Sequence, residues 1–469
     1  MLTLLSGVAV AQVLTYAARP VVTRLYGPEE FGVLTVFIAL LGLITAGGTG
    51  HYEDALMLPS RRADAARLLA LALAASLLSA VVVGVLLPFR SLLAAALGGE
   101  GLAATLLLLP AAGFAAAAAQ AVETWHTRFD RYRVVSSGRI SQGVVTTAIQ
   151  IAGGVVGAGA VGLAAGAAAG FAALLVPTGY VLLRKDGAVL RAVLRRPAEL
   201  AVAARRYRRF PTYTAPAALL NVLAGRVPVF GLAAAFGTGP TGLFGLAFAT
   251  LAVPVGMVTA AVGQVFFVRA AEAHRHGQLG PLTRSVHSRL AALATYPVLA
   301  AAVAGPALFA LVFGAEWADA GRYARALAPW LLLSSVAPPL GRIFDVLERQ
   351  RTDLAFSAAQ AVSLAAAIAF AARAADPFVA VAATAALGTV FRGAQIGWLL
   401  HAAGAPLAGC AGDFARVFLR AAPFLAAGHA AGYLSGSIIV ETLVLAVGGL
   451  AFYAWEGRRG PSAGPARGA

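Results

Sequence analysis

Charged side chains are scarce in this chain. Asp, Glu, Lys and Arg make up only 12% of its 469 residues, whereas about a quarter of the residues of a typical soluble domain are charged. Hydrophobic residues make up 60% of the chain, and its mean hydropathy is +0.81. Because so few polar groups cannot cover a water-exposed surface, the composition excludes an ordinary soluble protein and indicates a membrane protein.

Cysteine and lysine are nearly absent as well. The single cysteine, Cys410, excludes an intramolecular disulfide and any site that needs a Cys-x-x-Cys pair. Lys185 is the one lysine, and it follows Arg184 rather than a glycine, so no Gly-Lys-Ser/Thr phosphate loop is present. This absence excludes an ATP-driven motor of the Walker type.

Two further patterns carry no chemistry. Residues 157–162 satisfy Gly-x-Gly-x-x-Gly, but they lie in a short turn between apolar segments with no strand before them, so the context of a dinucleotide site is missing. His274 and His276 lie in a charged loop without further ligands nearby, which favours a solvated face. We therefore expect no catalytic residue, no metal site and no bound cofactor.

Long apolar segments recur from one end of the chain to the other. A helix of about 20 apolar residues spans the roughly 30 Å hydrocarbon core of a bilayer. We therefore predict an all-α polytopic membrane protein with about fourteen transmembrane helices. Their expected ranges are 3–24, 31–50, 66–88, 102–122, 138–158, 161–183, 212–236, 241–268, 288–313, 324–346, 354–374, 377–400, 414–433 and 437–455.

The basic residues alternate with these segments. They concentrate in every second loop, at 59–67, 125–139, 184–211, 269–289, 347–353 and 401–416, and in the C-terminal tail. The intervening loops are short and nearly uncharged. Basic loops stay on the cytoplasmic side, so we predict a cytoplasmic (inner) membrane protein with both termini inside. The net charge of +16 is then topological and does not indicate nucleic-acid binding. The first apolar segment lacks a basic region before it and is expected to be retained.

Two similar halves are predicted. Residues 25–32 and 236–245 are both Gly-Pro turns that close on Phe-Gly, and each follows the first helix of a group of six. This favours parallel repeats related by an axis along the membrane normal. We expect an N-terminal six-helix lobe at 1–183, a basic surface linker facing anionic head groups at 184–211, a C-terminal six-helix lobe at 212–400, and two additional helices with a cytoplasmic tail at 401–469.

A few charged or polar residues fall inside the expected spans, where each charge costs roughly 2.5–3.5 kcal/mol and normally faces a polar interior. Arg19 and Arg226 lie away from the cytoplasmic interface and have no acid within one turn of their own helix. The substrate-binding residues are predicted to be Arg19, Arg24, Asn221, Arg226, Gln264, Arg342 and Arg392. Exchange of a proton or sodium ion is predicted at Glu53, Asp54, Glu123 and Asp345. The alternatives stay open: these acids serve as counter-ions, and Arg342 and Asp345 neutralise each other.

Four stretches carry a family resemblance. Residues 19–32 resemble the opening of bacterial polysaccharide-biosynthesis flippases, the O-antigen or lipopolysaccharide translocases of the multidrug/oligosaccharidyl-lipid/polysaccharide exporter superfamily. His51-Tyr52-Glu53, with Ala55 and Leu58-Pro59, is similar to the end of their second helix, although the family often has Arg at position 51. Residues 262–267 and 313–321 resemble later signatures of that family.

The resemblance implies two six-helix lobes around a central cationic cavity that alternates its access. It also implies the substrate, an undecaprenyl-diphosphate-linked oligosaccharide, with membrane lipids, a polysaccharide polymerase and chain-assembly proteins as partners. Three other functions stay open. A drug/cation antiporter would present acids in the cavity, a lipid-linked peptidoglycan-precursor flippase would share the cationic cavity, and a membrane polymerase or ligase would need a sizeable outer loop.

Overall fold

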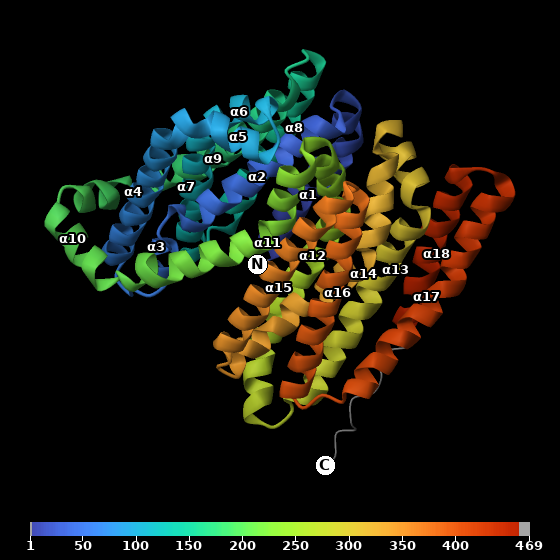
Figure 1. Ribbon diagram of the computed structural model, residues 1–469. Helices are drawn as coiled ribbons and strands as arrows, with labels where there is room; N and C mark the ends of the chain where they lie inside the picture. Colours follow the sequence, from blue (N-terminus) through green and yellow to red (C-terminus); the bar gives the residue numbers. More distant parts are fainter. Residues whose placement is uncertain (1, 459–469) are drawn as a thin grey trace. The chain divides into compact units, whose positions relative to one another are not determined.

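The computed structural model describes residues 2–458; within that range it leaves undescribed the side chains of residues 2–11, 13, 100, 253–255, 257–258, 260–261, 264, 268 and 350. Every regular element among the described residues is a helix (Figure 1). The chain divides into two compact units, residues 1–242 and 243–469. The predicted lobe boundaries at 183 and 212 stay a prediction.

The first unit consists of eleven α-helices and the start of a twelfth. They are α1 (Leu2–Leu25), α2 (Pro28–Gly48), α3 (Tyr52–Ala55), α4 (Arg62–Leu86), α5 (Arg90–Leu97), α6 (Glu100–Thr105), α7 (Leu109–Arg128), α8 (Tyr132–Val155), α9 (Gly159–Leu194), α10 (Pro197–Arg206) and α11 (Ala215–Phe236). The twelfth, α12 (Thr238–Arg275), continues into the second unit. The second unit then contains α13 (Leu279–Phe313), α14 (Ala318–Val346), α15 (Gln350–Ala371), α16 (Pro377–Ala402), α17 (Leu407–Ser435) and α18 (Ile438–Arg458).

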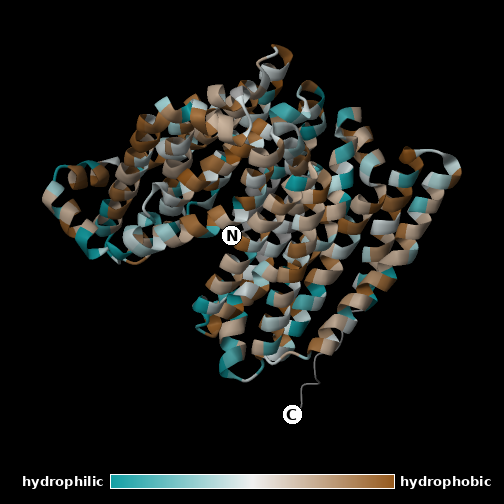
Figure 2. Ribbon diagram, viewed as in Figure 1, coloured by the Kyte–Doolittle hydropathy of each residue, from teal (hydrophilic) through white to brown (hydrophobic). Residues whose placement is uncertain are grey.

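The predicted fold class is confirmed. Within residues 2–458, ten helical segments are long and apolar enough to cross a membrane. The other four expected spans coincide with α1, α8, α12 and α17, which are 24, 24, 38 and 29 residues long. Figure 2 shows brown and pale residues along the long helices, with teal concentrated near helix ends and around α10. A multi-pass helical membrane protein follows from this pattern.

Packing in the first unit centres on small residues. Helices α8 and α9 pack along each other, α1 packs on α8, and α7 packs on α9 and α4. The aromatic centre of this core is Trp125, which is fully buried among alanine and leucine side chains of α4 and α7. Glycine and alanine allow the backbones of membrane helices to approach closely. Van der Waals packing then stabilises the helix pairs, because the hydrophobic effect does not drive association of helices within lipid.

The basic linker is more regular than a loop. Helix α9 continues through the charged segment to Leu194, and α10 follows after a short turn. Leu190, Val193 and Leu200 pack against the core around Trp125, while arginines such as Arg195 and Arg205 are exposed. The apolar positions interleaved with the arginines therefore hold the linker onto its own unit.

The two Gly-Pro turns that resemble each other in sequence meet in the first unit. A Cβ added at Gly32 would collide with the backbone of Thr238, and a Cβ added at Gly242 would collide with the carbonyl oxygen of Pro28. Pro28 and Thr238 are the first residues of α2 and α12, and each glycine is the fifth residue of its helix. The contact is therefore reciprocal, as expected where two similar segments are related by a two-fold axis.

The second unit has its own core. Helix α14 packs on α13 and α16, and α17 and α18 pack against each other and against α13 (Figure 1). Phe344 of α14 stacks on Trp398 of α16, with ring centroids 5.0 Å apart. Helix α13 kinks at Gly305, which has a φ of 28° and directly precedes Pro306. A proline inside a helix removes one backbone hydrogen bond and clashes with the preceding turn, so it bends the helix at this point.

Candidate functional site

Two predicted arginines lie in apolar helices of the first unit without an acidic partner. Arg226 is in the middle of α11, and its Nη2 would lie 3.6 Å from a Cβ at Gly42 of α2. Arg19 lies on α1 with its guanidinium 4.8 Å from the ring centroid of Tyr16. Both side chains are half-buried, and no acid among the described residues forms an ion pair with either one.

The neighbouring polar groups are more open. Arg24, at the end of α1, and Asn221, on the first half of α11, are both exposed. They lie on the same two helices, α1 and α11, that carry Arg19 and Arg226.

Glu53 and Asp54 lie in the single-turn helix α3, directly after the left-handed residue His51. The Glu53 side chain is 2% exposed and accepts a hydrogen bond from Gln120 Nε2 at 2.9 Å. Burial raises the pKa of Glu53. His51 Nδ1 is 2.7 Å from Asp54 Oδ2, and this hydrogen bond raises the pKa of His51. The two predicted ion-coupling acids thus share one imidazole.

Glu123 has a different environment. Its Oε2 accepts a hydrogen bond from Arg139 Nη2 at 2.6 Å, which joins α7 to α8. Glu123 is 9% exposed, and a buried carboxylate in apolar surroundings requires such a partner. The geometry is that of the counter-ion alternative, although the cation is Arg139 rather than Arg19 or Arg226.

In the second unit the predicted groups pair locally. Arg342 Nη1 lies 3.5 Å from Asp345 Oδ2, and both side chains are exposed. Arg392 Nη1 donates to Gln395 Oε1 at 2.6 Å, and Gln395 Nε2 lies 3.5 Å from Asp353 Oδ1 on α15. The neutralisation alternative for Arg342 and Asp345 agrees with this geometry. The side chain of Gln264 lies outside the described residues.

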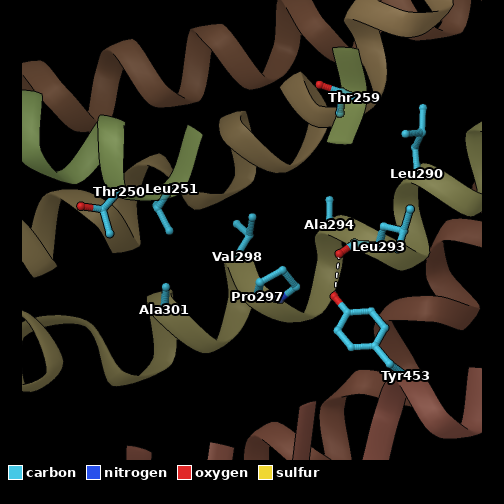
Figure 3. Close-up of a pocket in the computed structure, with 10 residues that line it drawn as sticks. All are labelled: Thr250, Leu251, Thr259, Leu290, Leu293, Ala294, Pro297, Val298, Ala301 and Tyr453. Atoms are coloured by element: carbon cyan, nitrogen blue, oxygen red, sulfur yellow. Dashed lines mark hydrogen bonds between the residues drawn. The ribbon is translucent and has the colours of Figure 1, made fainter. Parts of the chain in front are cut away.

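An apolar cavity of about 330 Å³ also lies in the second unit (Figure 3). Its wall comes from α12, α13 and α18, and Tyr453 closes one side by donating a hydrogen bond to the Leu293 carbonyl at 2.7 Å. The lining residues are Thr250, Leu251, Thr259, Leu290, Leu293, Ala294, Pro297, Val298, Ala301 and Tyr453. A cavity of this chemistry suits hydrocarbon rather than a charged group.

The sequence prediction missed Asp186, which is fully buried in the C-terminal part of α9. Arg131 Nη1 lies 2.6 Å from Asp186 Oδ2, Trp125 Nε1 donates to the same oxygen at 2.9 Å, and Arg62 pairs with Oδ1. Burial lowers the pKa of Arg131. An available signal was overlooked: Asp186 is one of two acids within the basic stretch 184–211.

The other acid of that stretch, Glu199, ties α10 to α4. Its carboxylate pairs with Arg67 and lies 3.0 Å from Arg196 Nη1. A hydrogen bond from Arg196 lowers the pKa of Glu199; desolvation opposes this lowering, and a hydrogen bond from Arg67 adds to it. Both acids of the linker therefore fasten it to the first unit.

Long apolar helices that retain a few charged groups in their interior define a multi-pass membrane protein. No curated protein matches the chain in sequence. The chain does match the family described as "Polysaccharide biosynthesis protein" over residues 21–322, which is most of its length. It belongs to that family, as the motifs at residues 19–32 and 313–321 predicted.

Solved structures share the fold. The lipid II flippase MurJ in an inward closed conformation has a TM-score of 0.66 at 11% identity, over 96% of this chain and 99% of that one. An inward-facing multidrug resistance MATE family transporter of the MOP superfamily has a TM-score of 0.60 at 16% identity, over 83% and 95%. A MOP superfamily transporter from Pyrococcus furiosus has a TM-score of 0.55 at 13% identity, over 86% and 95%. The chain shares its fold with these three proteins.

Proposed function

We propose that this protein is a flippase that carries an undecaprenyl-diphosphate-linked oligosaccharide from the cytoplasmic to the outer leaflet by alternating access. The observation that carries the proposal is the presence of Arg19 and Arg226 in apolar helices without an acidic partner among the described residues. Membership of the polysaccharide biosynthesis family supports a saccharide-bearing substrate, and the undecaprenyl-diphosphate carrier is part of the proposal.

The chemistry of arginine fits a diphosphate. Placing a charged side chain inside a span costs roughly 2.5–3.5 kcal/mol, so an arginine retained there without a counter-ion needs another compensating group. A planar guanidinium donates two parallel, charge-assisted hydrogen bonds to adjacent phosphate oxygens. Either Arg19 or Arg226 can hold the anionic head in this way, and Arg24 and Asn221 are exposed polar groups on the same two helices.

The apolar cavity of the second unit supports a lipid substrate. Its wall combines α12 and α13 of this unit with the late helix α18. A dry cavity lined by aliphatic carbon binds a hydrocarbon segment by removing apolar surface from water or lipid. We propose that this cavity binds a hydrocarbon segment of a lipid, an assignment that stands separately from the arginines of the first unit.

The membrane potential supplies a driving force without ATP. The proposal places the protein in the inner membrane with both termini in the cytoplasm. The anionic substrate then moves outward, away from the negative interior of the cell. This movement is favoured by about 2.3 kcal/mol per charge per 100 mV. Ion exchange is not required for this movement, and two of the acids predicted for it, Glu123 and Asp345, already pair with Arg139 and Arg342. A polysaccharide polymerase and chain-assembly proteins would receive the product.

A substrate-class experiment tests the proposal. The purified chain is reconstituted into liposomes with a fluorescent diphosphate-linked glycolipid, and a membrane-impermeant quencher reports which leaflet holds it. Empty liposomes provide the background rate. We expect glycolipid transfer that a diphosphate-linked lipid competes for and that a cationic drug does not. Transfer only of cationic dyes would favour an antiporter, elongation of the glycan would favour a polymerase, and transfer restricted to peptidoglycan precursors would assign the other flippase function.

A further inference from the structure

His51, Glu53 and Asp54 form a compact cluster of potential metal ligands. One ligand atom from each residue lies within 4.8 Å of the other two. His51 Nδ1 is 2.7 Å from Asp54 Oδ2 and 3.7 Å from Glu53 Oε1. Zinc–nitrogen and zinc–oxygen bonds of about 2.0–2.2 Å in a tetrahedral site place neighbouring ligand atoms roughly 3.3 Å apart. Small side-chain rotations therefore suffice to surround one ion.

The Glu53 carboxylate carries an independent sign of a missing partner. Its side chain is 2% exposed, and Oε1 accepts a hydrogen bond from Gln120 Nε2. The other oxygen, Oε2, is buried without a hydrogen-bond partner in the described part of the chain. An unpaired oxygen of a buried carboxylate is costly, and a bound cation would compensate it.

The backbone presents these residues together. His51 has a φ of 55°, a left-handed conformation that ends the run of α2 and begins α3. This turn directs His51 toward the two carboxylates that follow it, while Gln120 of α7 fixes the orientation of Glu53. The nearest arginine contacts in this segment are those of Arg128, whose guanidinium donates to the carbonyls of Leu56 and Pro59. Those bonds leave the carboxylates to the imidazole.

We propose that His51, Glu53 and Asp54 bind a divalent transition-metal ion of the zinc class. One imidazole nitrogen with two carboxylates is a ligand set that Zn²⁺ accepts, whereas Mg²⁺ and Ca²⁺ prefer oxygen alone. Three protein ligands leave a coordination position for water, on the side where Asp54 is 55% exposed. The ion joins the end of α2 to α3 and, through Gln120, to α7. The sequence prediction of no metal site considered only cysteine pairs and the histidines of one charged loop.

The experiment measures zinc directly on the full-length chain. The affinity tag is removed because it would bind metal, and the protein in detergent is dialysed against micromolar Zn²⁺ with millimolar Mg²⁺. Elemental analysis should find about one zinc ion per chain. Co²⁺ in place of Zn²⁺ should give a visible absorption band that Zn²⁺ abolishes. Both readouts are independent of transport activity.

Three variants locate the ion. His51→Asn removes the imidazole and keeps a residue that tolerates left-handed backbone, while Glu53→Gln and Asp54→Asn remove one charge each. Each should lower zinc affinity by more than about tenfold. His429→Asn is the matched control, because His429 lies in the second unit and pairs with a single acid, Glu441, at 3.2 Å among the described residues. Asp54 is exposed, so its variant keeps the fold even where Glu53→Gln fails.

Four outcomes would overturn the proposal. They are no zinc on the wild type, equal zinc on wild type and Asp54→Asn, loss of zinc in His429→Asn, and displacement of the ion by Mg²⁺ at equal concentration. The last outcome would assign a site for hard cations instead.

Discussion

Replacing Asp186 by Asn should destabilise the protein more than any other single isosteric change at its predicted cytoplasmic end. The Asp186 side chain is fully buried, and its carboxylate receives Arg131, Trp125 and Arg62. Asparagine keeps the shape and the hydrogen bond from Trp125 but removes the negative charge. Arg131, whose side chain is 16% exposed, is then left largely buried without a counter-ion.

The magnitude follows from burial. Removing one partner of a buried ion pair costs about 3–5 kcal/mol. Arg62 is 44% exposed and can turn into water, so the loss arises mainly from Arg131, and we expect about 2–4 kcal/mol for Asp186→Asn. Arg62→Gln should cost no more than about 1 kcal/mol, as for other exposed pairs.

The assay is reversible unfolding in mixed micelles with increasing SDS, followed by circular dichroism. Asp130→Asn is the control, because Asp130 is exposed, lies in the neighbouring loop, and its side chain accepts a hydrogen bond from Tyr132 Oη. It should change the free energy of unfolding by less than about 0.5 kcal/mol. The reasoning is refuted if the free energy of unfolding of Asp186→Asn lies within that margin of the wild type, or if Arg62→Gln lowers it as much as Asp186→Asn does.

Three further predictions concern other parts of the chain. Glu199 has a lowered pKa, so its stabilisation of α10 is present above pH 4.5 and is lost as pH falls through the lowered value. The rate of amide hydrogen exchange in α10 should therefore rise as the pH falls through that value, and Glu199→Gln should remove this pH dependence. Gly32→Ala should destabilise by about 1–3 kcal/mol, because its Cβ meets the α12 backbone, whereas Gly179→Ala, with open space around it, should not; equal unfolding curves would contradict this contact. Ala301→Phe should slow transfer of a long-chain glycolipid severalfold and spare a short-chain analogue; equal effects on both lipids would remove the cavity from the pathway.

Hydropathy and charge bias predicted the fold because lipid imposes one simple requirement on every span. Each helix must present about 20 apolar residues, and this requirement is visible in sequence without knowledge of any partner. Local pairs were equally accessible. The i, i+3 spacing of Arg342 and Asp345 gave the neutralisation alternative, and the structure shows that pair.

Contacts between helices were not accessible in the same way. Glu53 meets Gln120 and Asp186 meets Arg62 across 67 and 124 positions of sequence, and nothing in either segment specifies which helix will lie opposite. The similar Gly-Pro turns were recognised in sequence, but their reciprocal contact between Gly32 and Thr238 depends on how α2 and α12 cross. The substrate-binding roles assigned to Arg19 and Arg226 stay predictions. The structure shows that no acid among the described residues pairs with them, whereas only a transport measurement shows whether they bind the substrate.

The most direct test of the account compares Arg226→Ala with Arg226→Lys in the liposome glycolipid assay. Arg373→Ala serves as the matched control, since Arg373 is exposed beyond the end of α15. We expect Arg226→Ala to lower the transfer rate at least tenfold, a loss of about 1.4 kcal/mol, Arg226→Lys to recover part of it, and Arg373→Ala to match the wild type. Wild-type rates for all three variants at equal reconstitution would contradict the assignment of the diphosphate to Arg226.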